Sequence, residues 1–127
     1  MEEALSLITN REWFEAHEAI EDLWRPAEGD RRRHLQGLIH LLVSLEHLRR
    51  RNPHGCLGQW KKACHRLHDV PNPFAGLEIH PWMAELEKFY GHLDLESAAR
   101  ARSFSVPVPE IETWPIPALA ADNSAVE

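Results

Sequence analysis

Residues 31–50, RRRHLQGLIHLLVSLEHLRR, decide the fold of this chain. Apolar side chains recur through the stretch at helical spacing, and they cover so many sides that we predict a buried central helix. The apolar positions are Leu35, Leu38, Ile39, Leu41, Leu42, Val43, Leu45 and Leu48. Pro26 and Gly29 end the segment before it, and Asp30 is expected to cap the central helix.

Shorter helices are expected on both sides of the central one. Their predicted ranges are 2–8, 10–25, 53–68, 81–92 and 94–102. Asn10, Asn52 and Asp94 are the predicted capping residues, because short polar side chains satisfy the free N–H groups at helix starts. No stretch of this body alternates as a strand does. The sequence therefore predicts an all-α fold, a single small helical bundle of about five helices.

The composition changes after residue 103. Residues 104–127 contain four prolines and no Lys or Arg, which predicts an extended Pro-rich, Trp-containing tail after a helical domain at 1–103. Apolar side chains on this scale usually find a partner. One interpretation is a strap packed on its own domain or on a dimer mate. The other is a docking segment, in which case the protein is an adaptor that acts through its tail.

Length and charge limit the classes of function. A chain of 127 residues is enough for one core, and a net charge of −6 argues against nucleic acid and anionic membranes as partners. No stretch approaches the roughly 20 apolar residues of a membrane span, so we predict a cytoplasmic protein. Cys56 and Cys64, about 12 Å apart along one predicted helix, cannot pair with each other. We expect both thiols to be reduced.

The clearest polar signal is FEAHEAIEDLW at residues 14–24. At about 100° per residue, His17 and Glu21 share the inner face of this helix with aromatic neighbours, and Glu18 lies at its edge. Gln36, His40 and His47 form a polar stripe on the central helix, so the two stripes are expected to meet in the core. The predicted ligand-or-network residues are His17, Glu18, Glu21, Trp24, Gln36, His40 and His47.

Three interpretations of this cluster stay open. Buried acids and imidazoles are costly unless paired, so the cluster is a satisfied structural network, a binding site or a metal site. The metal hypothesis uses His17, Glu21 and His40 as ligands of a divalent ion, and its enzyme version is a hydrolase with Glu18 as general base. The spacing lacks the second His of the HExxH zinc-protease motif, because Glu21 stands there. Whether the protein is an enzyme, and with which catalytic residues, is therefore left undecided.

The motif also carries a family resemblance. The run WFEAHEAIEDLW at 13–24, followed by LQGLI at 35–39 and Asn52-x-x-Gly55, resembles domain of unknown function family 309 over about residues 10–67. The resemblance implies a small all-helical prokaryotic protein in which the residues to watch are His17, Glu18, Glu21, Trp24, Gln36 and Gly37. The chain departs from the family pattern at His40, where Gln is more usual, and at Arg51 and Cys56, where Gly and Ala are common. The family brings no established activity.

These observations together predict a cytoplasmic, non-catalytic binding or structural protein that forms a homodimer. Its small-molecule ligand is not defined by the sequence. Neither a membrane nor nucleic acid is expected as a partner.

Overall fold

The computed structural model describes residues 1–121, and within them it contains six α-helices and no strand. The helices are α1 (Glu2–Thr9), α2 (Trp13–Trp24), α3 (Gly29–Arg49), α4 (Pro53–Arg66), α5 (Ile79–His92) and α6 (Leu95–Ala101). A single 3₁₀ turn, Ile111–Thr113, lies in the segment after α6. The all-α prediction is confirmed, with six helices in place of about five.

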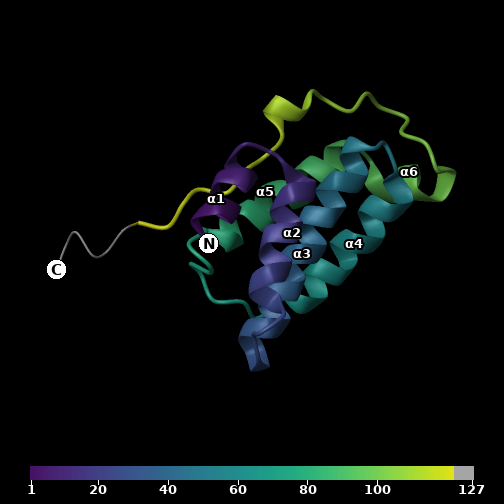
Figure 1. Ribbon diagram of the computed structural model, residues 1–127. Coiled ribbons are helices and arrows are strands. Elements are labelled where there is room, and N and C mark those ends of the chain that lie inside the picture. Colours follow the sequence, from purple (N-terminus) through teal and green to yellow (C-terminus); the bar gives the residue numbers. More distant parts are fainter. Residues whose placement is uncertain (122–127) are drawn as a thin grey trace.

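The central helix organises the packing. Figure 1 shows α2, α3 and α4 side by side, and α3 packs against both of its neighbours. Ten residues of α3 are buried, including six leucines with no exposed surface at Leu35, Leu38, Leu41, Leu42, Leu45 and Leu48. Burying one such side chain contributes about 1.5–3 kcal/mol, so this helix supplies a large part of the core. The predicted buried central helix is confirmed.

Helix starts differ in detail from the predicted caps. Asn52 caps α4 as expected, since its side-chain oxygen accepts a hydrogen bond from the Gly55 N–H at 3.0 Å. Asn10 instead follows the end of α1, and α2 begins after Glu12, whose side chain makes no cap hydrogen bond. Asp30 lies inside the first turn of α3, and Asp94 precedes α6 without a side-chain cap bond.

Two glycines allow close approaches around α3 and α4. A Cβ on Gly37 would lie 2.6 Å from the side chain of Leu67, so α3 passes the end of α4 where only glycine fits. A Cβ on Gly55 would lie 2.6 Å from Nδ1 of His47. The Gly of the Gln36-Gly37 pair and the Gly of Asn52-x-x-Gly55 therefore serve helix packing.

The segment after α6 returns along the outside of the bundle toward α1 (Figure 1). Trp114 is fully buried in the same apolar core as the helices, and its backbone oxygen accepts hydrogen bonds from Arg11 at 2.8 and 3.0 Å. The indole N–H of Trp82 on α5 donates to the oxygen of Pro115 at 3.0 Å. Residues 104–121 thus pack as a strap on their own chain; residues 122–127 of the predicted tail lie outside the described residues.

Two smaller predictions are also answered. Cys56 and Cys64 both lie on α4 and are free thiols. None of the helices described here has the length and apolar character needed to cross a bilayer.

Candidate functional site

His17 and Glu21 share one face of α2, as their spacing predicts, and their side chains pair there. Nε2 of His17 lies 3.1 Å from a carboxylate oxygen of Glu21, one helical turn away, and Nδ1 contacts the backbone oxygen of Phe14. The side chains are 16% and 34% exposed, so they sit at the edge of the bundle and not in its core, where we predicted them. Both ring nitrogens of His17 are engaged within the chain.

Glu18 and Trp24 belong to different surroundings. Glu18 is exposed and lines a hollow between α1 and α2, away from the other predicted site residues. The ring of Trp24 lies beneath the guanidinium of Arg32 at 3.9 Å, and Arg32 also donates to the backbone oxygens of Trp24 and Arg25. Trp24 therefore positions an arginine that satisfies the carbonyl end of α2. Its own indole N–H is buried and has no hydrogen-bond partner among residues 1–121.

The polar stripe of α3 is half-buried and satisfied mainly by α4. His40 Nδ1 donates to the side-chain oxygen of Gln59 at 2.7 Å, and Gln36 accepts from Arg66 at 2.9 Å. His47 lies further along the helix, where its Nδ1 accepts from the side-chain amide of Asn52 at 3.1 Å. The stripe predicted to face α2 therefore makes its hydrogen bonds across the α3–α4 interface.

The structure does not assemble the predicted metal ligands. Within residues 1–121, no three His, Cys, Asp or Glu side chains lie close enough to one another to hold a metal ion. His17 and Glu21 lie together on α2, whereas His40 of α3 is hydrogen-bonded to Gln59 of α4. The hydrogen bonds of the cluster are thus divided between α2 and the α3–α4 interface.

A groove opens where α3 meets α4. It has a volume of about 430 Å³ and is lined by Gln36, His40, Lys61, Lys62, His65 and Arg66. A smaller hollow of about 200 Å³ shares Gln36 and His40 with it and extends to Glu21 and Trp24 on α2. The predicted Glu, Trp, Gln and His side chains meet here, on an open surface.

The groove concentrates positive charge on an acidic protein. Lys61, Lys62 and Arg66 contribute three cations along one side of α4, and none of them forms an ion pair within residues 1–121. Like charges held together without a counter-ion raise the local potential and attract anions. The chain as a whole carries a net charge of −6, so this positive groove is a local feature.

The pKa of the His40 imidazole is lowered in this groove. Burial lowers the pKa of this imidazole below 6.5, and the positive charges of Lys62 and Arg66 lower it further, whereas the hydrogen bond that His40 donates to Gln59 raises it. The ring is therefore neutral at physiological pH, with Nδ1 carrying the proton given to Gln59. Nε2 is left with a lone pair at the groove, which can take up a proton if an anion binds beside it.

Four of the groove residues were missed at the level of sequence. Lys61, Lys62, His65 and Arg66 lie on α4, and none of them was among the site residues predicted from the sequence. The available signal was the spacing of Lys62 and Arg66, and of Lys61 and His65, at i and i+4 on one side of that helix. The spacing places the charges together but does not show that they face the His40 stripe.

Comparison with known proteins agrees with the predicted resemblance. A family model described as a domain of unknown function (DUF309) matches residues 1–58, which confirms the family prediction over α1 to α3 and the first turn of α4. The match begins earlier and ends earlier than the predicted range of 10–67. No curated protein and no solved structure matches the chain.

Proposed function

We propose that this protein is a non-catalytic binding protein that holds a small anion, a phosphate or carboxylate group, in the α3–α4 groove. The observation that carries the proposal is the set of unpaired cations, Lys61, Lys62 and Arg66, around a groove of about 430 Å³. Anions are held by such clusters through charge-assisted hydrogen bonds, which are stronger than neutral ones.

The polar contacts of the groove support binding more than chemistry. Gln36 fixes the guanidinium of Arg66, and Gln59 fixes the ring of His40, so two groups that would touch an anion are held in place before it arrives. Preorganised donors bind with a smaller entropic cost. Ser44, the nearest hydroxyl on the same helix, is fully buried and donates to the Cys56 carbonyl, so it supplies no nucleophile to the groove.

The test is a binding titration with inorganic phosphate and, separately, succinate, at constant ionic strength to hold screening fixed. We expect one site with a dissociation constant of about 1 mM or below. Lys62→Gln should weaken it about tenfold. Lys88→Gln, which removes the same charge from the exposed face of α5, is the matched control and should leave it unchanged. Equal effects of the two substitutions would reject the groove as the site.

Metal binding, homodimer formation and adaptor function through the tail stay predictions beside this proposal. A metal bound through His17, Glu21 and His40 would be detected as stoichiometric metal in protein purified without an affinity tag and lost in Glu21→Gln. Homodimer formation is tested by sedimentation. The adaptor hypothesis needs a tail that is free to dock, whereas Trp114 is buried against its own chain.

A further inference from the structure

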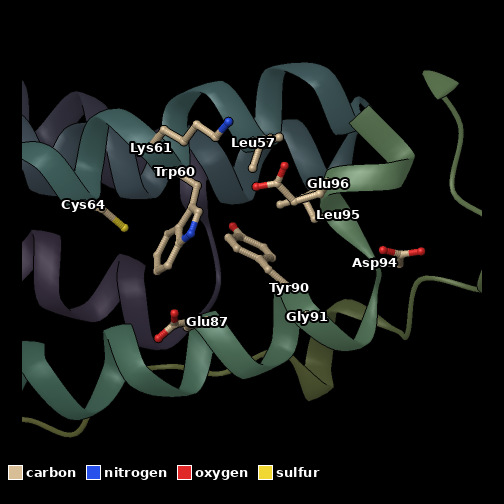
Figure 2. A pocket seen from close by; sticks show the side chains of 10 residues that line it. All are labelled: Leu57, Trp60, Lys61, Cys64, Glu87, Tyr90, Gly91, Asp94, Leu95 and Glu96. Atoms are coloured by element: carbon tan, nitrogen blue, oxygen red, sulfur yellow. The ribbon is translucent and has the colours of Figure 1, made fainter. Parts of the chain in front are cut away.

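A second pocket lies on the opposite side of α4 from the hydrogen bonds to His40. It has a volume of about 370 Å³ and is formed by α4, α5 and the start of α6. Figure 2 shows Trp60 and Tyr90 at its centre, Glu87 beside the indole, and Glu96 reaching in from α6. A pocket of this size matches the lower range of small-molecule sites.

The aromatic centre of this pocket is held rigidly. Trp60 and Tyr90 pack edge to face with ring centroids 5.1 Å apart. The Tyr90 hydroxyl lies 2.8 Å from Oγ of Ser44, and Ser44 in turn donates to the Cys56 carbonyl at 2.8 Å. These buried hydrogen bonds fix the tyrosine ring, while Trp60 is half-buried and exposes part of its indole to the pocket.

The charges around the aromatic pair are predominantly negative. The lining contains three acidic residues, Glu87, Asp94 and Glu96, and one basic residue, Lys61, so its formal charge is −2. None of these four side chains forms an ion pair within the described part of the chain. An indole face flanked by carboxylates is the environment that attracts an organic cation, through the ring quadrupole and through direct charge pairing.

We infer that this pocket binds a small organic amine, with its ammonium group between Glu87 and the Trp60 ring and its apolar part against Leu57 and Leu95. The inference is independent of the anion groove, because it depends on a different set of side chains. Lys61 lines both sites, so its side chain lies on the ridge between them.

The test uses 2-phenylethylamine as the probe and its neutral analogue 2-phenylethanol as the comparison. Binding is followed on the intact chain by the NMR signal of the Trp60 indole N–H, assigned with Trp60→Phe. We expect the amine to shift this signal and to bind about fivefold to tenfold more tightly than the alcohol. Glu87→Gln should remove that preference, whereas Glu85→Gln, an exposed neighbour on α5, should keep it.

Three outcomes would overturn the inference. The alcohol could bind as tightly as the amine, which would make the pocket merely apolar. Phenylacetate could bind more tightly than either, which would assign the pocket to Lys61 and an anion. The Glu85→Gln and Glu87→Gln variants could behave alike, which would show that the acid beside the indole does not select the ligand.

Discussion

Gly37 is the residue at which a single added methyl group tests the packing most sharply. A Cβ there would lie 2.6 Å from Cγ of Leu67 and 2.9 Å from Cβ of Arg66. Because a methyl group at this helix crossing would overlap its neighbours, we expect Gly37→Ala to lower the free energy of unfolding by about 1–3 kcal/mol, as measured by urea unfolding.

The control for this substitution is Gly58→Ala on α4. A Cβ at Gly58 meets nothing within 4 Å, so alanine should raise stability by about 0.4–1 kcal/mol through its better helix propensity. A neutral Gly37→Ala would show that α3 and α4 are further apart than described.

His40 and His47 predict a pH dependence of stability. Burial lowers the pKa of both imidazoles below 6.5 in the folded chain, and nearby arginines or lysines lower it further. Below pH 6.5 the unfolded chain therefore binds more protons at these residues than the folded one, so their contribution to stability is present above that pH and is lost as the pH falls through the folded pKa.

The measurement is urea unfolding of wild type and His40→Gln at a series of pH values from neutral downward. Glutamine can keep a hydrogen bond to Gln59 but cannot take up a proton, so the variant should lose stability less steeply on acidification. If the free energy of unfolding fell equally steeply with pH in both proteins, the contribution of His40 would be contradicted.

At the scale of single residues, the sequence allowed some contacts to be predicted. The spacing of His17 and Glu21 was sufficient to place them on one face of the helix, because residues four apart are neighbours, and the structure pairs them there. Burial of the cluster was not predictable. Helical phase gives the direction of a side chain, whereas depth depends on where the next helix lies, and α4 meets α3 at Gln36 and His40, leaving both half-buried.

The start of α4 is the helix end most dependent on one side chain. Asn52 accepts from the Gly55 N–H and also contacts His47 of α3. We expect Asn52→Ala to lower the free energy of unfolding by about 1 kcal/mol, the usual value of a capping side chain. Glu28→Ala at the start of α3 is the control, because Glu28 makes no side-chain cap bond. If the two variants lost the same stability in thermal or urea unfolding, the capping role of Asn52 would be contradicted.

The positions of the helices were predictable from the sequence, but only some of their capping residues were. Asn52-Pro53 combines a cap with a first-turn proline, two signals that agree, and α4 begins there. Asn10 carried one signal, and the chain used it after α1, where the backbone of Arg11 turns with a φ of 59° before α2 begins. A lone polar residue between two helices fits the end of one as well as the start of the next.

Over the whole molecule, the strap is part of the core. Trp114 is completely buried and its indole N–H donates to Pro109 at 2.8 Å, so Trp114→Ala should lower the free energy of unfolding by about 3–5 kcal/mol. Leu119→Ala is the matched control in the same segment, since Leu119 is 54% exposed and should cost little. The adaptor hypothesis expects the helical body to be indifferent to both substitutions, as judged by circular dichroism and thermal unfolding.

The sequence indicated that this strap packs against a surface, but it did not identify that surface. Its apolar side chains favoured burial, but composition does not distinguish packing on its own domain from packing on a partner. The answer depends on Arg11 and Trp82, which lie far away in sequence and meet the strap only once α1, α2 and α5 have packed. The groove between α3 and α4 was equally hard to predict, because its cations lie on α4 whereas Gln36 and His40 lie on α3.

The most direct test of the anion groove is the titration of His40 by NMR, with and without saturating phosphate. We expect the anion to offset Lys62 and Arg66 and to raise the pKa of His40 from its lowered value, and we expect Lys62→Gln to need about tenfold more phosphate for its rise. An unchanged pKa of His40 in the presence of bound phosphate would contradict the proposal, because it would place the anion elsewhere on the molecule.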